Sequence, residues 1–227
     1  MIKSLFNLFF PKACLGCSQF LLNNESVICT ECRHNIPLTH HHLHSDNEVM
    51  TKFYGRLPLE HGSSLMYFHK KGIVQELIHN LKYRNHQEIG TVIGNWYGHE
   101  LKNCATLTDI DFIIPIPLHH KRQQKRGYNQ VTEFGKSLSE HLNCTFEEQL
   151  LKRTHYSKTQ TFKDLMSRNE IKTHTFQVFP SEIHHQKHFL LIDDVLTTGA
   201  TLEAAGKTLL QIPGAKISIV CMAMSHS

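Results

Sequence analysis

The chain has 227 residues, of which 40% are hydrophobic and 19% charged, a composition typical of a soluble globular protein with one main core and room for a small second module. Its 24 Lys and Arg residues exceed its 20 Asp and Glu residues by only four, which excludes the strong positive charge of an obligate nucleic-acid coat. No stretch reaches the roughly 18 consecutive apolar residues that a transmembrane helix needs, so we expect no membrane span.

The first ten residues imitate the start of a signal peptide. Lys3 is followed by an apolar run, but Lys12 lies where a cleavage site should carry no charge. The chain has seven cysteines, an odd number, and four of them are grouped in a way that disulfides rarely require. We therefore expect a reducing, cytoplasmic location.

Two C-x2-C pairs near the N-terminus are separated by eleven residues. Their members are Cys14, Cys17, Cys29 and Cys32. Each pair can wrap the backbone around a tetrahedral zinc ion, and a site with four thiolates leaves no open position for catalysis. The spacing therefore predicts a structural Zn²⁺ site. A redox-active C-x-x-C pair is the alternative, although that chemistry needs only one such pair.

The composition changes near residue 50, which predicts two units. They are an N-terminal zinc-knuckle module over residues 1–50 and a larger α/β domain over residues 51–227. Four histidines within residues 40–44 fall just before the boundary. We expect a solvated, flexible turn there, with a metal site as the alternative.

Strand-like and helix-like patterns alternate along the larger unit. Apolar runs predict strands over 62–68, 112–117, 189–192 and 216–224. Apolar residues at helical spacing predict helices over 73–81, 89–97, 131–142 and 202–210. The last helix joins two strands into a parallel βαβ unit, expected to be right-handed. We expect a basic loop over 118–130 and, because the polar stretch over 152–172 has no consistent period, a mobile or functional loop there.

The strand at 189–192 runs directly into two adjacent carboxylates, Asp193 and Asp194, and then into a turn that opens a helix. The turn residues are Thr197, Thr198, Gly199, Ala200 and Thr201. In a parallel sheet, ligands bind beyond the carboxyl ends of the strands, and backbone N–H groups at a helix N-terminus suit a phosphate. The carboxylates suit ribose hydroxyls or a magnesium ion. Together these features predict a site for a phosphorylated ribose, with simple helix capping as the alternative.

Residues 189–201 resemble the phosphoribosyl pyrophosphate (PRPP) motif of type I phosphoribosyltransferases. From Cys14 to the C-terminus the chain is similar to the ComF family, called GntX in some bacteria. The other motifs that carry this similarity are the paired cysteines, Leu81-Lys82-Tyr83, Ile114-Pro115-Ile116-Pro117, Arg126-Gly127-Tyr128-Asn129-Gln130 and Ser157-Lys158-Thr159-Gln160-Thr161. The resemblance implies a type I phosphoribosyltransferase-like α/β fold, with a mostly parallel sheet flanked by helices and a small four-cysteine zinc module.

The resemblance also implies residue roles. Asp193 and Asp194 would be catalytic and would hold Mg²⁺, through the ribose or through water, while the turn at 197–201 would bind the 5-phosphate of PRPP. The residues implied to bind pyrophosphate are Arg126, Gly127, Lys158 and Arg168.

The basic loop and the polar stretch contain further positions that bear on pyrophosphate binding. Lys121 and Arg122 are further candidates for pyrophosphate, with a solvated loop as the alternative. The sequence departs from the family at Ile171, where an asparagine is usual.

The resemblance implies a phosphoribosyltransferase that binds PRPP with Mg²⁺ and acts in natural competence, in the uptake of single-stranded DNA. Its partners would be PRPP and, in addition, single-stranded DNA or proteins of the uptake machinery. A non-catalytic PRPP-binding sensor and a zinc-knuckle adaptor for nucleic acid or protein are the alternatives. The sequence offers no recognisable pocket for the acceptor, and the N-terminal segment is the candidate for that role.

Overall fold

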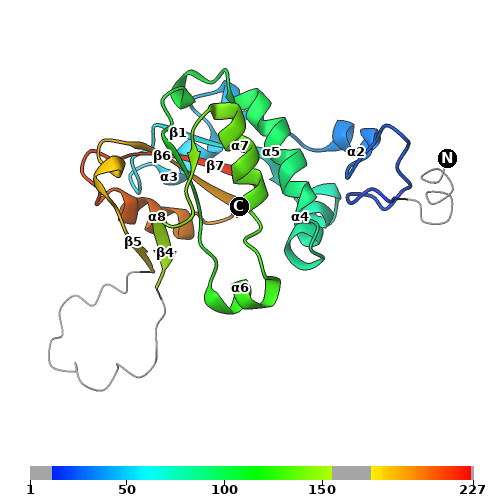
Figure 1. Ribbon diagram of the computed structural model, residues 1–227. Helices are drawn as coiled ribbons and strands as arrows, with labels where there is room; N and C mark the ends of the chain where they lie inside the picture. The colour runs from blue at the N-terminus through cyan, green and yellow to red at the C-terminus, as the bar shows by residue number, and fades with distance from the viewer. Residues whose placement is uncertain (1–11, 155–174, 226–227) are drawn as a thin grey trace.

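A five-stranded, wholly parallel sheet lies at the centre of the computed structural model, which describes residues 12–154 and 175–225 (Figure 1). The strand order is β1-β7-β6-β2-β3, and neighbours pair in parallel throughout. The strands are β1 (His61–Phe68), β2 (Phe112–Pro115), β3 (Thr145–Phe146), β6 (His188–Leu196) and β7 (Lys216–Ser225). A separate antiparallel pair consists of β4 (Leu151–Arg153) and β5 (Phe176–Val178).

Helices cover both faces of the sheet. The α-helices are α2 (Thr30–Asn35), α3 (Glu48–Phe53), α4 (Ile73–Tyr83), α5 (Glu88–Leu101), α6 (His120–Arg126), α7 (Thr132–Leu142) and α8 (Ala200–Leu209). Short 3₁₀ turns occur at η1 (His41–Leu43), η2 (Ala105–Leu107) and η4 (Glu182–His184). Helices α4, α5 and α7 pack in one core, and α3 and α8 pack in another. Figure 1 shows α4, α5 and α7 gathered on the side of the sheet away from α8.

The central strands are buried on both faces because their side chains alternate between these two cores. In β6, Leu190 and Ile192 belong to the core with α4, α5 and α7, whereas Phe189 and Leu191 belong to the core with α8. Continuous apolar runs are typical of parallel strands covered on both sides. The four predicted strands and the four predicted helices are confirmed, with ends that differ by a few residues.

The expectation of a basic loop over 118–130 is wrong for its central part, which forms α6. This helix has no buried residue, so the apolar spacing that reveals other helices is missing. The His119 ring accepts a hydrogen bond from the backbone N–H of Lys121 at its start. Gly127 ends it in the left-handed region at φ 76°, a conformation that glycine adopts without strain.

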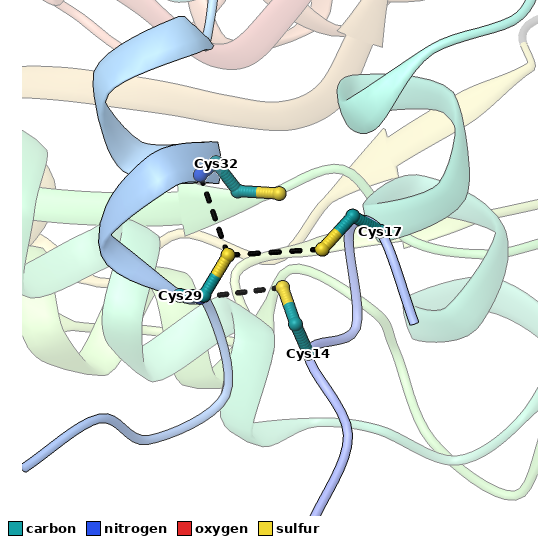
Figure 2. Close-up of side chains that lie close together, drawn as sticks. All are labelled: Cys14, Cys17, Cys29 and Cys32. Atoms are coloured by element: carbon teal, nitrogen blue, oxygen red, sulfur yellow. Dashed lines mark hydrogen bonds between the residues drawn. The ribbon is translucent and has the colours of Figure 1, made fainter. Parts of the chain in front are cut away.

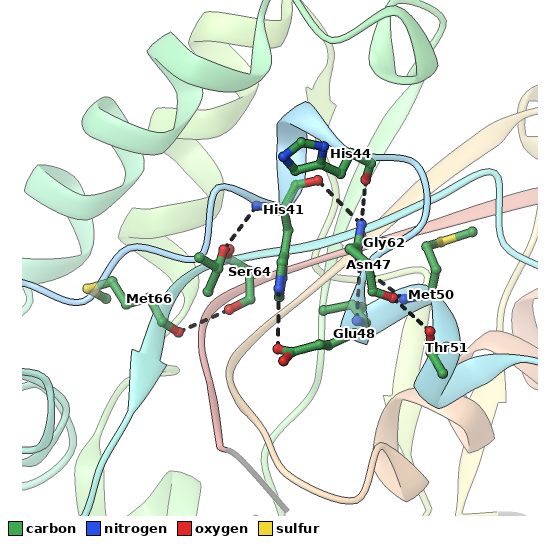
Figure 3. A network of polar contacts seen from close by, with 11 residues as sticks. His41, His44, Asn47, Glu48, Met50, Thr51, Gly62, Ser64 and Met66 are labelled. Atoms are coloured by element: carbon green, nitrogen blue, oxygen red, sulfur yellow. Dashed lines mark hydrogen bonds and ion pairs between the residues drawn. The ribbon is translucent and has the colours of Figure 1, made fainter.

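The histidine-rich segment is not the solvated turn that its composition predicts. It forms η1, in which His41 is buried and its Nε2 lies 3.5 Å from a carboxylate oxygen of Glu48 (Figure 3). The Asn47 side chain holds the segment in place, since its Nδ2 donates to the carbonyl oxygens of His44 and Gly62. Its Oδ1 accepts from two N–H groups at the start of α3.

The segment before α3 also covers the outer edge of β1, the edge that β7 does not occupy. Thr39 donates its backbone N–H to the carbonyl of Leu65, and Tyr67 donates to the carbonyl of Pro37. These bonds satisfy backbone groups that an edge strand otherwise leaves open. The predicted boundary at residue 50 falls within α3, and it stays a prediction. In the part of the chain that the structure describes, no helix is long and apolar enough to span a bilayer.

Three glycines let α5 and α7 approach closely. Gly90, Gly94 and Gly98 follow one another at intervals of four residues, so they share one face of α5. A Cβ atom built on Gly94 would lie 2.7 Å from the Cβ of Ser137 and 2.8 Å from the carbonyl oxygen of Phe134. Real carbon atoms do not approach that closely, so this contact requires a residue without a side chain.

We expect Gly94→Ala to destabilise the protein. Alanine gains roughly 1 kcal/mol of helix propensity over glycine, but overpacking a close contact costs about 1–3 kcal/mol and forces α5 away from α7. The free energy of unfolding, measured by denaturant titration, should fall, whereas His99→Ala on the exposed side of the same helix should change it by less than about 0.5 kcal/mol. A more stable Gly94→Ala protein would contradict the packing.

Candidate functional site

The carboxyl end of β6 carries a buried carboxylate with one open oxygen. Asp194 is 5% exposed, and its Oδ1 lies 2.8 Å from the Nζ of Lys82 on α4. Its Oδ2 is buried without a hydrogen-bond partner among the described residues. A buried acceptor in this state costs free energy, so a ligand that donates a hydrogen bond to it is favoured.

Asp193 and Asp194 are consecutive residues of β6, so their side chains point to opposite faces of the sheet. Burial raises the pKa of Asp193, and the adjacent charge of Asp194 raises it further, although Lys82 and Arg153 oppose both effects. The Oδ1 of Asp193 accepts a hydrogen bond from the backbone N–H of Asp194 at 2.8 Å. A cation or a hydroxyl donor at this position would relieve the repulsion between the two carboxylates.

The turn after β6 exposes backbone N–H groups at the start of α8. Gly199 is the N-cap, with φ 78°, and a Cβ there would lie 2.9 Å from the ring of Phe53. Both constraints require glycine. The turn surrounds a hollow of about 40 Å³ that also contacts Asp193. Thr197, Thr198, Ala200 and Thr201 are exposed around it. The Ala200 N–H already donates to Oγ1 of Thr198 at 3.4 Å, but the positive end of a helix dipole with hydroxyl groups around it still favours a phosphate.

A cavity of about 440 Å³ adjoins this turn and collects charges of both signs. Its lysine, arginine, aspartate and threonine lining residues are Lys82, Arg122, Arg126, Arg153, Asp193, Asp194, Thr197 and Thr201. The four basic side chains come from α4, α6 and β4, which lie far apart in the sequence. The cavity can therefore bind a polyanion next to a pair of carboxylates.

The segment from Arg126 to Gln130 fixes one wall of this cavity through contacts to several elements. Arg126 donates from Nη1 to Oε1 of Gln130 at 2.6 Å. The Tyr128 hydroxyl donates to the carbonyl oxygen of Leu81, and Asn129 donates from Nδ2 to the carbonyl oxygen of Ile116 at 3.0 Å. These bonds tie the end of α6 to α4 and to the residue after β2, so the Arg126 guanidinium is held in place.

The structure brings most of the residues predicted for this site together. Arg126, Asp193, Asp194, Thr197 and Thr201 line the large cavity, and the complete turn at 197–201 lines the hollow beside it. Gly127 ends α6 and does not line either. Lys158 and Arg168 lie outside the described residues. The roles assigned to all of these residues stay predictions.

Sequence reasoning missed two of the basic residues that line the cavity. Lys82 belongs to a motif of the family resemblance, but nothing in the sequence indicates that it pairs with a carboxylate 112 positions later. Arg153 lies on β4, at the start of the polar stretch, where no local pattern marks it. Arg122, a weaker candidate, lines the cavity, whereas Lys121 does not.

A second site lies at the N-terminal end of the described chain. The four cysteine sulfurs, from Cys14, Cys17, Cys29 and Cys32, lie within 4.8 Å of one another, and Figure 2 shows them turned toward a common centre. The sulfurs of Cys17 and Cys29 are 3.7 Å apart. This distance equals that between two ligands about 2.3 Å from a tetrahedral zinc ion.

Backbone donors point at these sulfurs. Burial opposes ionisation of Cys14, but backbone N–H groups of Cys29, Gly16 and Cys17 lower its pKa below the usual value. Donors of this kind stabilise a thiolate, the form that binds a metal. The predicted four-cysteine cluster is confirmed, and it can bind a metal ion.

The cysteine cluster packs directly on α4. Asn80 donates from Nδ2 to the carbonyl oxygen of Leu15 at 2.8 Å, and a Cβ on Gly16 would lie 2.9 Å from the side chain of Ile73. Cys14, Cys29 and Cys32 belong to the same apolar core as Leu77 and Leu81 of that helix. Helix α4 thus contacts the cluster and, through Lys82, the acidic pair.

Comparison with known proteins adds to these geometric findings. A domain family described as "Phosphoribosyl transferase domain" matches residues 132–227. The chain is 27% identical over 204 residues to "Competence protein ComFC" of Bacillus subtilis, a match that covers 88% of this chain and 78% of that protein. It is 32% identical over 108 residues to "Competence protein F" of Haemophilus influenzae, covering 47% of each. The chain is thus similar to proteins of the ComF family and contains a phosphoribosyltransferase domain.

A further relative of this chain is "DNA utilization protein YhgH" of Escherichia coli O157:H7. The two are 29% identical over 150 residues, and the match covers 64% of this chain and 65% of that protein. The chain therefore matches less than two thirds of the length of this relative.

Solved structures of phosphoribosyltransferases are also similar, at low identity. An adenine phosphoribosyltransferase from Saccharomyces cerevisiae is 15% identical with a TM-score of 0.41, over 63% of this chain and 72% of that chain. One from Trypanosoma brucei is 14% identical with a TM-score of 0.37, over 80% and 81%. The predicted fold class is confirmed: this is a type I phosphoribosyltransferase-like α/β fold with an N-terminal four-cysteine cluster.

We expect Lys82→Met to destabilise the protein by about 3 kcal/mol, because removing one partner of a buried ion pair leaves the other charge uncompensated. Denaturant titration at neutral pH measures the effect. Lys136→Met is the matched control, since that lysine pairs with Glu133 but is 53% exposed, and exposed pairs contribute only about 0–1 kcal/mol. Equal effects of the two substitutions would contradict the importance of the Lys82–Asp194 pair.

Proposed function

We propose that this chain binds PRPP with Mg²⁺ in the cavity at the end of β6 and transfers its phosphoribosyl group to an acceptor. The observation that carries the proposal is the open, buried Oδ2 of Asp194 in a cavity that also collects two threonines of the phosphate-type turn and four basic side chains. Each part of PRPP then has a partner of matching chemistry.

The assignment of groups follows from charge and hydrogen-bonding capacity. The turn at 197–201 holds the 5-phosphate through backbone N–H groups and hydroxyls. Asp194 accepts a hydrogen bond from a ribose hydroxyl through its open oxygen. Arg122, Arg126 and Arg153 face the pyrophosphate, since guanidinium groups bind phosphate oxygens in pairs.

Magnesium fits the carboxylate pair. Mg²⁺ prefers oxygen ligands, usually one or two carboxylates with the substrate's phosphates, and Asp193 and Asp194 offer such oxygens. When bound, the ion neutralises charge that develops on the departing pyrophosphate. The adjacent carboxylates repel each other, and a cation near Asp193 would offset that repulsion and favour the ionised form of Asp193.

The residues of the chain then act by position and charge. As the bond between the ribose C1 and pyrophosphate breaks, negative charge grows on the leaving group near the three arginines. The turn anchors the opposite end of the molecule, so that C1 stays aligned with an acceptor. This transfer needs no nucleophilic side chain.

The names of the relatives favour a role in DNA use. Two are called competence proteins and another a DNA utilization protein, so we assign this chain to competence or DNA utilisation, with single-stranded DNA or uptake proteins as partners. Zinc in the four-cysteine cluster stabilises the module that packs on α4.

Titration calorimetry with PRPP and Mg²⁺ tests the proposal. We expect a Kd near ~1 µM, or about 8 kcal/mol, and a loss of at least about a hundredfold in Asp194→Asn, which corresponds to roughly 2.8 kcal/mol. Asp193→Asn should also weaken binding, while Asp46→Asn, an exposed carboxylate elsewhere, should bind like wild type. Absence of binding in wild type would overturn the proposal. Binding without pyrophosphate release for any acceptor would instead indicate a non-catalytic sensor.

Removal of zinc should unfold the cysteine module locally. Purified protein should contain about one zinc per chain, and a strong chelator should raise hydrogen exchange over residues 14–36, because zinc supplies most of the folding free energy in such small modules. Exchange in β6 and β7 should change much less. Cys144→Ser, a cysteine outside the cluster, should keep the full zinc content. Zinc-free protein with unchanged exchange would contradict a structural metal.

A further inference from the structure

An arginine outside the proposed PRPP site contacts the turn at 197–201. Arg56 lies between α3 and β1, and its Nη1 donates a hydrogen bond to the carbonyl oxygen of Thr198 at 3.1 Å. Thr198 lines the hollow that the turn surrounds, whereas Arg56 lines neither this hollow nor the large cavity. Arg56 therefore contacts the backbone of the turn without occupying the space for a ligand.

The other N–H groups of Arg56 fix its guanidinium in this position. Its Nε and Nη2 donate to Oε2 of Glu203 at 2.9 and 2.5 Å, and its Nη1 also donates to the carbonyl oxygen of Lys52 at 3.1 Å. The guanidinium lies over the ring of Phe53, 5.7 Å from its centroid. Only a planar group with several N–H directions can make these contacts at once, so a lysine could not replace it.

The contact with Thr198 determines which way the next N–H group points. The C=O of Thr198 and the N–H of Gly199 belong to one planar trans peptide, in which they point in opposite directions. Because the C=O points to Arg56, the N–H of Gly199 points away from Arg56. Glycine has no Cβ, so this peptide can adopt either orientation without a steric penalty. The hydrogen bond from Arg56 favours one of the two.

Arg56 also offsets a negative charge near the turn. Glu203 lies in the first turn of α8, and its backbone N–H donates to the carbonyl oxygen of Gly199 at 2.8 Å. Its carboxylate would repel a phosphate bound at the start of the helix. Lys207 and Arg56 both pair with this carboxylate, and their hydrogen bonds hold the pKa of Glu203 below its usual value.

We propose that Arg56 is a positioning residue for the 5-phosphate: by holding the carbonyl oxygen of Thr198, it keeps the N–H of Gly199 turned toward the phosphate. This inference rests on the proposed PRPP site and adds to it a residue that touches no ligand. The sequence gives no sign of this role, because 142 positions separate Arg56 from Thr198.

Two probes separate the two ends of PRPP. Ribose 5-phosphate carries the group that the turn binds, and pyrophosphate with Mg²⁺ carries the group that faces the arginines of the cavity. Titration calorimetry of wild type should detect binding of both. Arg56→Ala should weaken ribose 5-phosphate binding at least about tenfold and leave the pyrophosphate affinity within about twofold, which also shows that the variant is folded.

Two further variants separate position from charge. Arg56→Lys keeps the positive charge but not the planar set of N–H groups, so it should weaken ribose 5-phosphate binding at least about fivefold. Arg33→Met is the matched control, since Arg33 is an exposed arginine on α2 that lies over the ring of Trp96 and lines neither site. Its affinities for both probes should equal those of wild type.

The N–H of Gly199 can be observed directly. Gly199 is the only glycine that follows a threonine in the sequence, so protein labelled with carbonyl-¹³C threonine and ¹⁵N glycine isolates this one amide in an NMR spectrum. Saturating ribose 5-phosphate should shift the amide proton of Gly199 downfield in wild type, because a phosphate accepts its hydrogen bond. In Arg56→Ala, saturated with the same probe, this shift should be lost.

Four outcomes would overturn the inference. The first two concern Arg56→Ala and are unchanged ribose 5-phosphate binding and an equal loss of both probes. The third is wild-type affinity in Arg56→Lys, which would reduce the role of Arg56 to its charge. The fourth is a downfield shift of the Gly199 amide that persists in Arg56→Ala. Failure of ribose 5-phosphate and PRPP to bind wild type is a separate result, which overturns the proposed function and this inference with it.

Discussion

The site depends on one electrostatic constraint: two adjacent carboxylates lie at the end of a strand that is buried on both faces. Like charges this close to an apolar core are costly unless a positive group faces them. Lys82 meets that requirement for Asp194, and it does so from α4, an element more than a hundred residues earlier. The position of α4 against β6 is therefore as important for the site as the acidic motif itself.

Helix α4 is held from its other side by the cysteine module. Asn80 bonds to the backbone of Leu15, and three of the cysteines share an apolar core with the helix. The cluster thus stabilises the element that carries Lys82. The four-cysteine cluster can in this way support a cavity that it does not line.

Sequence patterns predicted much of this fold because strands covered on both faces and amphipathic helices leave periodic apolar signals. The acidic motif and the paired cysteines could also be recognised in the sequence, because each is a short segment whose functional groups lie close together along the chain. Helix α6 was missed because it buries no residue. The burial of His41 was missed because composition alone does not reveal that Glu48 and β1 lie beside it.

The least predictable features are contacts between distant segments. Lys82 with Asp194, Arg126 over Tyr83, and Arg153 on the cavity wall all depend on how separate elements pack. Their residue types are common on protein surfaces, so only the fold distinguishes them from solvated side chains.

The segment that precedes α3 forms hydrogen bonds with β1, on the other side of the predicted boundary near residue 50. Its backbone and the Asn47 side chain bond to the free edge of β1, at Gly62, Leu65 and Tyr67. An open strand edge is a template on which other chains can add and aggregate, and here the chain closes that edge with its own N-terminal residues. Hydrogen bonds therefore cross the boundary that composition predicts near residue 50. On the β1 side of the sheet, these residues therefore leave fewer backbone groups open to pairing with a second chain.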